Sequence, residues 1–541
     1  MVLCAILQEA WFEVLLARSA VVSDIKGGMS AIFGKLLDVF WDPQGFDMHH
    51  GGVCLKLYEG MPLHVFMKMD VFMADEAALH AIFSCKGSSG LKPCFLCQNI
   101  FNAKLRPEIV KQDTTGFAQV HTCVDVEKLV LHTTQTIHGI AIRLASAAVT
   151  MSKTDFAELQ TRLGWNFVPE GILMNARWRS LLWPTRHGMY DWMHVWLVHG
   201  VMNTHVGLMM RALKPHGVTY AVLDEYTSQF HWPKCMGLAG KDVFCQKRAK
   251  SSWDDGSLKA SASESLSVLP VLACFLQGVA KKSGNEVVQQ HASSFALMAK
   301  TIEMLQNGGR RTICPDILQQ SVAAHLTSFT ALFGTEAMTP KFHYCLHFVD
   351  FSRRFGFVPN CFALERKHKV PKRFANEVRN TNCAWEASVL REVSSHHIGA
   401  LTVGGKAHFQ AEVALVAGHA ASKKLNNSLQ QEFGAPGVQF SAARCARINA
   451  WERCSVHDVV MVDVAGELVV GKVLLHAAAT VGDQQQVFSS IAKWEFISEE
   501  GRSSKWLRRA EKMMCWTGNI MCAVTWAGSG EVVTVLKPQR V

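Results

Sequence analysis

The sequence predicts an α/β protein in which a long helical block separates two strand-containing parts, and three observations support this. Apolar residues recur at helical spacing from about residue 125 to 345, for example in HASSFALMAKTIEMLQ. Alternating apolar and polar residues mark strands in 52–75 and again in 440–540. The 541 residues are 49% hydrophobic and only 18% charged, so the chain can build more than one apolar core.

The elements follow from this pattern in chain order. A helix-like stretch opens the chain, and two strands joined by a Glu-Gly turn come next, the second ending at Asp75. A short helix (76–84) and a Gly- and Ser-containing loop (86–93) follow, while the Ser-rich stretch 247–265 is expected to be a loop within the helical block. The expected segments are 1–124, the helical block 125–338, a return segment 339–400, a linker 401–439, and a small β-barrel or SH3-like module 440–541.

Charge and cysteine content narrow the class of protein. The formal charge is +10, a moderate basic excess that is compatible with nucleic-acid contact. The seventeen cysteines are scattered and include only one Cys-x-x-Cys pair, so we expect a reducing compartment rather than a disulfide framework. No segment reaches about 18 uninterrupted apolar residues, so no membrane-spanning helix is expected.

Four residues far apart in the sequence have the types and spacing of metal ligands. Cys94 and Cys97 supply two thiolates on one turn, which suits half of a tetrahedral zinc site. His343 and His347 are four residues apart and would lie on one face of a helix, which suits the other half. Taken separately, the cysteines could be buried thiols or a redox pair, and the histidines ordinary helix residues. A redox pair would need a thioredoxin-like context, which the sequence lacks.

A carboxylate accompanies each half of this set. Asp75 precedes Cys94 by nineteen residues, and Glu365 follows His347 by eighteen. If one zinc ion joined the two halves, it would bring the regions of Asp75 and Glu365 together. Two carboxylates placed in this way are suited to divalent-metal phosphoryl chemistry on nucleic acid.

Four runs carry a resemblance to a known family: ADEAALHAIFSCKGSSGLKPCFLC, YDWMHVWLVHG, TPKFHYCLHFVDFSRRFG and FALERKHKVPKRFAN. Together they resemble DDE transposases of the CACTA/En-Spm type (the CMC superfamily) over roughly residues 10–395. The resemblance implies an RNase H-like core interrupted by a long helical insertion. It also implies DNA strand cleavage and transfer, the chemistry of DNA recombination in transposable elements, by two Mg²⁺ or Mn²⁺ ions on an Asp-Asp-Glu triad.

The resemblance assigns roles to individual residues. Asp75 matches the second Asp of the triad and Glu365 its acidic residue, while Asp191 and His194 match an Asp-x-x-His pair near the active centre. The catalytic subunit of the V(D)J recombinase, a distant relative, holds structural zinc with residues that match Cys94, Cys97, His343 and His347. Basic residues around Glu365 would neutralise DNA phosphates: Arg353, Arg354, Arg366, Lys369, Lys372 and Arg373.

One departure from the family pattern bears on activity. The first Asp of the triad lies on the opening strand of the RNase H-like sheet, whereas Asp24 and Asp38 occur here in helix-like contexts. The sequence therefore predicts an incomplete core, as in an N-terminally truncated transposase. Because two-metal catalysis needs carboxylates to hold both ions, we expect an inactive enzyme.

Two alternatives stay open at this stage. The first is a catalytically dead, zinc-containing DNA-binding protein. The second is a chromatin-associated interaction protein that acts through the C-terminal β-module, where Trp451, Trp494 and Trp526 could contact a partner. The expected partner is DNA, and self-association is possible. No membrane or small-molecule cofactor is expected. The expected location is the nucleus, or the cytosol for a chain that is not expressed as an active transposase.

Overall fold

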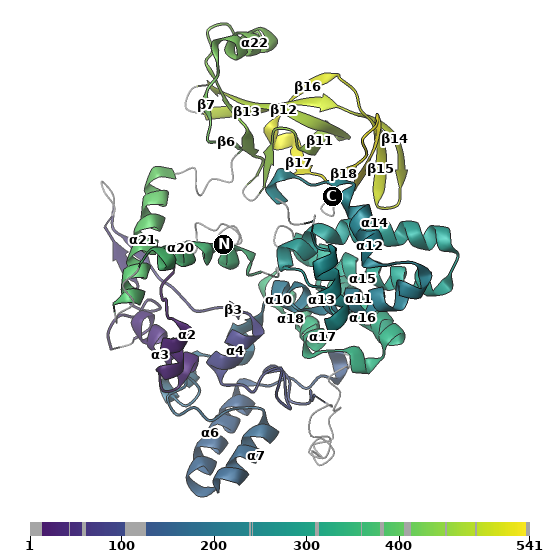
Figure 1. Cartoon of the computed structure of the whole chain (residues 1–541). Helices are drawn as coiled ribbons and strands as arrows, with labels where there is room; N and C mark the ends of the chain where they lie inside the picture. The colour runs from purple at the N-terminus through teal and green to yellow at the C-terminus, as the bar shows by residue number, and fades with distance from the viewer. Residues whose placement is uncertain are drawn as a thin grey trace. The chain divides into compact units, whose positions relative to one another are not determined.

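The computed structural model is a mixed α/β fold with a β-rich C-terminal region, and it comprises two compact units (Figure 1). The core unit comprises Glu13–Trp196 and Gly308–Ser395, and the β-rich unit comprises Leu197–Asn307 and His396–Val541. The unit boundaries thus divide the expected helical insertion, whose middle part, 197–307, belongs with the C-terminal strands. The residues described are 13–42, 44–56, 61–102, 126–236, 240, 242–308, 313–356, 358, 360–378, 384–404, 413–449, 452–481 and 484–536.

The strands of the core unit are short and form two pairs. β1 (Val53–Leu55) and β2 (Leu63–Val65) are antiparallel, whereas β3 (Phe72–Ala74) runs parallel to β4 (Gly188–Tyr190). The expected second strand is therefore two strands, β2 and β3, and the turn at 57–60 lies outside the described residues. Because Ala74 pairs with Tyr190, the residues that follow β3 and β4 lie side by side at one edge.

Helices of the core unit begin and end at recognisable signals. Asp75 caps α4 (Glu76–Phe83), and the expected opening helix is divided into α2 and α3 by Gly27, whose φ is +87°. Residues 1–12 of that expected helix lie outside the described residues. The other helices that begin in this unit are α2 Ser19–Asp24, α3 Gly28–Phe40, α6 Thr134–Thr150, α7 Lys153–Leu163, α8 Ala176–Leu181, α9 Pro184–His187, α10 Trp192–Leu197, α16 Pro315–Phe333, α17 Pro340–Tyr344, α18 Phe348–Phe355, α19 Phe362–Lys367, α20 Lys369–Glu377 and α21 Trp385–Gly404.

The β-rich unit contains six of the longer helices in the described part of the chain, and one of them corrects an expectation. The expected loop 247–265 is wrong over its first half, because α13 spans Gln246–Asp255. Its serines act as helix signals instead: Ser261 begins the next helix through a capping box with Glu264. The helices are α11 Val201–Leu213, α12 Tyr220–Ser228, α13, α14 Ala262–Ser283, α15 Glu286–Asn307 and α22 Lys423–Phe433.

Helix α14 has the length and apolar composition of a membrane-crossing segment, alone among the helices in the described part of the chain. Half of its most apolar window is buried inside the structure. It contacts α15, and Val268, Leu269 and Leu272 on it are fully buried. Burial of this kind is also what the core helix of a folded unit shows.

The expected C-terminal strands are present as two main sheets that share a hydrophobic cluster. Val459 and Val470 of one sheet pack with Trp506 and Val533 of the other. In the first sheet, β11 and β12 are joined by Ala465 and Gly466, both with positive φ, as a tight hairpin requires. The first sheet has the order β16 (Lys512–Trp516), β13 (Gln484–Lys493), β12 (Glu467–Val481), β11 (Val459–Val464) and β17 (Ile520–Ala523), with β8 (Phe440–Ala443) and β7 (His419–Ala420) beside β12.

The second sheet extends beyond the C-terminal region. Its order is β14 (Glu495–Glu500), β15 (Ser503–Leu507), β19 (Val532–Leu536), β18 (Trp526–Ala527) and β5 (Phe230–His231). Since β5 follows α12, a strand from the helical part completes a sheet of the expected β-module. This pairing explains why the two segments form one unit. A further small sheet contains β10 (Arg453–Ser455), β9 (Cys445–Arg447) and β6 (Ala414–Val416).

Candidate functional site

Cys94, Cys97, His343 and His347 converge in the core unit, as the sequence predicts, and we call them the Cys2His2 cluster. Their ligand atoms all lie within 4.8 Å of one another, and all four residues are buried. The His347 Nε2 atom lies 3.3 Å from the Cys94 Sγ, 3.6 Å from the Cys97 Sγ and 3.1 Å from the His343 Nε2. Four donor atoms that face one another in this way can hold a metal ion.

These spacings can be compared with those that a tetrahedral ion would impose. Zinc–sulfur bonds of about 2.3 Å and zinc–nitrogen bonds of about 2.0–2.1 Å separate sulfur from nitrogen by about 3.5 Å, and two nitrogens by about 3.4 Å. The observed sulfur–nitrogen distances are 3.3 and 3.6 Å, and the nitrogen–nitrogen distance is 3.1 Å. These three distances lie within a few tenths of an ångström of the tetrahedral values, and all four donor atoms lie within 4.8 Å of one another, so the residues present fit such an ion.

The protonation of Cys94 and His343 favours cation binding, whereas burial and the neighbouring Cys94 raise the pKa of the Cys97 thiol well above its usual value. Burial opposes ionisation of the Cys94 thiol, but the Cys97 hydrogen bond and the two imidazoles together hold its pKa well below the usual value. Burial lowers the pKa of His343, which keeps its imidazole neutral. A thiolate beside a neutral imidazole is the protonation state in which these side chains bind metal.

Neighbouring groups hold the cluster in place. The backbone N–H of Leu96 donates to the Cys94 Sγ at 3.4 Å, and the Tyr190 hydroxyl donates to the same sulfur at 3.7 Å. Tyr344 stacks on Tyr190 with ring centroids 4.2 Å apart and donates to the Pro93 carbonyl at 2.8 Å. Because Tyr190 is the last residue of β4, this hydrogen bond connects the Cys2His2 cluster to the end of the strand that Asp191 follows.

A second group of polar side chains lies at that strand edge. Asp75 follows β3, Asp191 follows β4, and the Asp191 backbone N–H donates to the Ala74 carbonyl at 3.3 Å. His194 joins this group to α19, since its Nε2 lies 3.6 Å from the Glu365 Oε1. Burial lowers the pKa of His194, but Asp191, Asp75 and Glu365 outweigh this effect and raise it. The structure thus brings Asp191, His194 and Glu365 into contact at the end of β4, with Asp75 at the end of the neighbouring strand, and we call these four residues the strand-edge centre.

Asp191 has a different role from the other carboxylates. It is buried, and it accepts hydrogen bonds from His194 Nδ1 at 2.6 Å and from three backbone N–H groups: Met193, His194 and Cys361, at 3.2, 3.1 and 3.0 Å. Both of its oxygens are therefore committed. Asp75 uses Oδ1 to cap α4, and Glu365 is exposed, so these two carboxylates can still accept a cation.

Lys341, which the sequence analysis missed, connects the two sites. Its Nζ forms an ion pair with the Glu76 Oε1 at 2.9 Å and donates to the His194 carbonyl at 3.0 Å. Both side chains are 15% exposed. The only sequence signal was its position two residues before His343, which does not reveal a partner next to Asp75.

We expect Lys341→Met to destabilise the core unit by about 3 kcal/mol, because it leaves the mostly buried Glu76 carboxylate unpaired. Urea unfolding followed by tryptophan fluorescence would measure this change. The matched control is Lys153→Met on α7, whose exposed side chain should make the substitution neutral within about 0.5 kcal/mol. Equal stability of the two variants would show that the Lys341 ion pair contributes nothing.

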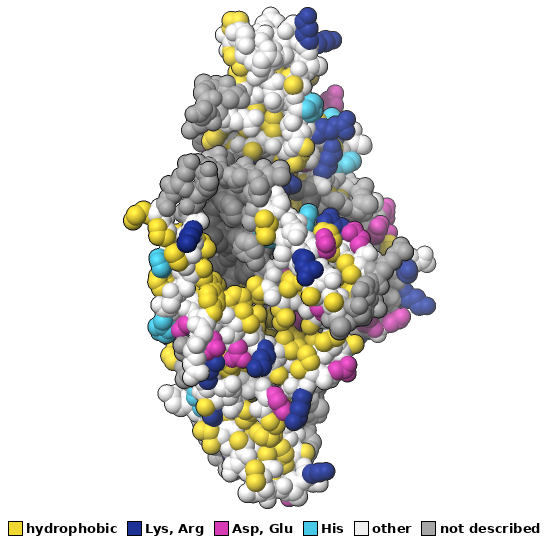
Figure 2. Space-filling view, turned by 90° about the vertical axis from the view of Figure 1, so that its left-hand side faces the viewer, with side chains coloured by type: hydrophobic (Ala, Val, Ile, Leu, Met, Phe, Trp, Pro, Cys, Tyr) yellow, Lys and Arg dark blue, Asp and Glu magenta, His cyan; other side chains and the backbone are white. Residues whose placement is uncertain are grey.

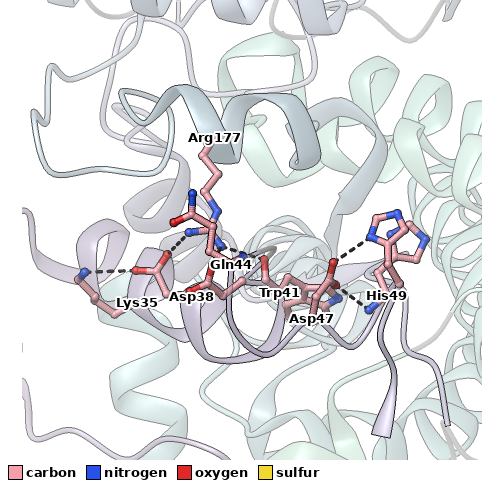
Figure 3. A network of polar contacts seen from close by, with 9 residues as sticks. Lys35, Asp38, Trp41, Gln44, Asp47, His49 and Arg177 are labelled. Atoms are coloured by element: carbon pink, nitrogen blue, oxygen red, sulfur yellow. Dashed lines mark hydrogen bonds and ion pairs between the residues drawn. The ribbon is translucent and has the colours of Figure 1, made fainter. Parts of the chain in front are cut away.

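The two other acidic residues considered as the first Asp of the triad lie elsewhere. Asp38, on α3, pairs with Lys35 at 3.2 Å and with Arg177 at 3.5 Å (Figure 3). Arg177 also pairs with Asp42 at 3.0 Å, so these carboxylates serve a surface ion-pair network. Asp24 is exposed at the end of α2. Neither supplies a further ligand to the strand-edge centre.

The predicted DNA-binding residues divide into two groups. Lys369, Lys372 and Arg373 are exposed on α20, directly after the helix of Glu365, and Arg366 is exposed on α19. Arg353 instead pairs with Asp316 at 2.9 Å. On the face shown in Figure 2, basic side chains occur in small groups rather than as one continuous patch.

A basic group surrounds His187 and contains Arg354, a predicted DNA contact, together with two cations that the sequence analysis missed. Burial, followed by the positive charges of Arg186 and Arg354, lowers the pKa of His187 to about 4, and Lys68 acts in the same direction. Arg186, Arg354 and Lys68 are exposed. They come from three separate segments, and no run of basic residues marked Arg186 or Lys68. This group adds cations close to β4, which begins at the next residue.

Comparison with known proteins gives no assignment. No family model matches the chain, and neither a curated protein nor a solved structure matches it.

Proposed function

We propose that this chain is a DNA-binding protein derived from a DDE-type transposase, with zinc in the Cys2His2 cluster and little or no strand-cleaving activity. The observation that carries the proposal is the strand-edge centre. Asp75 and Glu365 are 290 residues apart in sequence, yet the charges of both raise the pKa of His194, close to the ends of two parallel strands. Exposed cations follow on α20. This is the order of parts that an interrupted RNase H-like core would give.

The proposed zinc is structural. Two thiolates and two imidazoles fill four tetrahedral positions and leave none for water or substrate. The hydrogen bond from Tyr190 to Cys94 and the contacts of Lys341 link this cluster to the strand-edge centre. Loss of the metal would therefore disturb the positions of Asp191 and His194 as well as the local fold.

The strand-edge centre would hold a divalent cation, Mg²⁺ or Mn²⁺, between Asp75 and Glu365. Such an ion activates the attacking oxygen or stabilises the leaving one in phosphoryl transfer. A second ion needs a further bridging carboxylate, and Asp191 has both oxygens engaged by hydrogen bonds. The described residues therefore support binding of one ion better than binding of two. Basic side chains would contact DNA phosphates without reading the sequence.

Incubation of the purified chain with labelled duplex DNA and Mg²⁺ or Mn²⁺ should yield a protein–DNA complex and no strand breaks. The binding follows from the exposed cations and the lack of cleavage from the single-ion site. Gel electrophoresis under native and denaturing conditions separates the two outcomes. Robust cleavage that disappears in Asp75→Ala and Glu365→Ala would contradict the inactivity and show that another carboxylate completes the centre.

One observation favours the second candidate, an interaction protein. The C-terminal strands, which we interpret as a barrel-like module, carry a cavity of about 420 Å³ lined by aromatic and charged residues. Phe496 and Trp506 meet edge-to-face there at 5.2 Å. Trp494 also lines this cavity, whereas Trp526 stacks on His231 and Trp451 lies outside the described residues. Binding of a protein partner that survives loss of DNA binding would favour this candidate.

A further inference from the structure

The orientation of His194 is fixed from behind by a carboxylate. Its Nδ1 lies 2.6 Å from the Asp191 Oδ2, and Asp191 is 1% exposed. This contact makes Nδ1 the protonated nitrogen and leaves the lone pair of neutral His194 on Nε2. A carboxylate that holds one ring nitrogen while the other faces outward is the usual support of a metal-binding histidine.

Asp191 also fixes the helix that carries Glu365. The Cys361 backbone N–H donates to the Asp191 Oδ1 at 3.0 Å, and the Glu365 N–H donates to the Cys361 carbonyl at 2.8 Å. One buried carboxylate thus sets the positions of His194 and of the first turn of α19. As a result, Nε2 of His194 and Oε1 of Glu365 face each other at 3.6 Å. Two ligands of one ion approach each other at a similar distance.

We propose that His194 Nε2 joins Glu365 as a protein ligand of the divalent-cation site at the strand-edge centre, and that the site prefers Mn²⁺ over Mg²⁺. Asp191 is its positioning residue. The inference deepens the proposed function, on which it rests for the expectation that a divalent cation binds at the strand-edge centre. It adds that the site is not built from carboxylates alone.

The ligand types decide the metal preference. Mg²⁺ takes oxygen ligands, keeps several of its waters and dehydrates reluctantly. An imidazole nitrogen suits first-row transition ions better, and Mn²⁺ accepts carboxylate and imidazole together. His194 therefore strengthens the binding of Mn²⁺ selectively. A set of two carboxylates without His194 would discriminate much less between the two ions.

The test is a Mn²⁺ titration of the full chain, with its zinc retained and no DNA present, followed by electron paramagnetic resonance. The signal of unbound Mn²⁺ gives its free concentration and hence the affinity. The electron spin-echo modulation of bound Mn²⁺ shows whether an imidazole nitrogen is coordinated to the ion. We expect one Mn²⁺ per chain with a nitrogen signal. His194→Ala should remove this signal and weaken binding at least tenfold. Asp191→Asn should weaken binding about 10- to 100-fold, as loss of a supporting partner does.

His368→Ala is the matched control. His368 also lies near Glu365, at 3.8 Å, but it is 60% exposed on the surface. This variant should bind Mn²⁺ within about twofold of the original chain and keep the nitrogen signal. His194→Gln is measured as well, with zinc content as the check of folding, so that a misfolded alanine variant does not decide the test.

The inference is overturned if the unaltered chain binds no Mn²⁺, if bound Mn²⁺ shows no imidazole nitrogen, or if folded His194→Gln keeps the signal. DNA binding is measured separately by fluorescence anisotropy. Loss of the proposed function would appear there as no binding of duplex, whatever the Mn²⁺ result. A chain that binds DNA but lacks the nitrogen signal would refute only the role of His194.

Discussion

Replacing Cys97 by serine is expected to release the zinc and unfold the core unit. The Cys97 side chain is completely buried, and a serine hydroxyl does not replace a thiolate as a zinc ligand. Structural zinc contributes an apparent 10–16 kcal/mol of binding free energy, about as much as the whole stability of a typical protein. Metal analysis and thermal unfolding by circular dichroism would measure the loss of one zinc per chain and of the cooperative transition.

Cys345→Ser provides the control for this prediction. Cys345 is buried between His343 and His347, and its Sγ donates to the Lys341 carbonyl at 3.3 Å, a bond that a serine hydroxyl can also make. This variant should keep one zinc and a melting temperature close to that of the unaltered chain. A Cys97→Ser protein that also kept its zinc and its transition would contradict the cluster.

Removal of the three cations of α20 is expected to weaken DNA binding and to reduce its dependence on salt. Each phosphate contact contributes about −0.9 to the slope of log K against log salt concentration. The triple variant Lys369→Ala, Lys372→Ala, Arg373→Ala should therefore lower the steepness by about 2.7. Fluorescence anisotropy with a labelled duplex would give the DNA affinity and its salt slope. The salt concentration would be varied from about 50 to about 200 mM.

A second triple variant controls for net charge. Lys282, Lys423 and Lys424 are exposed in the β-rich unit, and their replacement by alanine removes the same three charges. This variant should lose much less affinity and keep the slope. Equal effects of the two triple variants would show that DNA affinity depends on the total charge of the chain and not on the cations of α20.

The Cys2His2 cluster could be predicted from the sequence because each pair of ligands lies within four residues. Cys-x-x-Cys and His-x-x-x-His each place two donors on one turn, and only pairing of the two halves was left to infer. The link from His194 to Glu365 carried no such signal, since 171 residues separate them. Tertiary packing alone creates that contact. Lys341 was missed for the same reason.

The errors in the fold have equally physical causes. Serine is a poor residue inside helices but a good cap, so the Ser-rich segment near α13 and α14 was interpreted as a loop. β5 has only two residues, and its pairing with β18 depends on a partner almost 300 residues away. The parallel pair β3 and β4 is three residues long, too short for its pairing to be predicted from alternation.

Diffraction from crystals soaked in Mn²⁺, recorded at the zinc and manganese absorption edges, tests the central claim most directly. The claim is that a zinc-bound core positions a divalent-cation centre at the edge of β3 and β4. It predicts one zinc peak among Cys94, Cys97, His343 and His347, and one manganese peak in contact with His194 and Glu365, beside the end of β3 where Asp75 lies. A Cys2His2 cluster without zinc, or manganese bound only elsewhere on the chain, would contradict it.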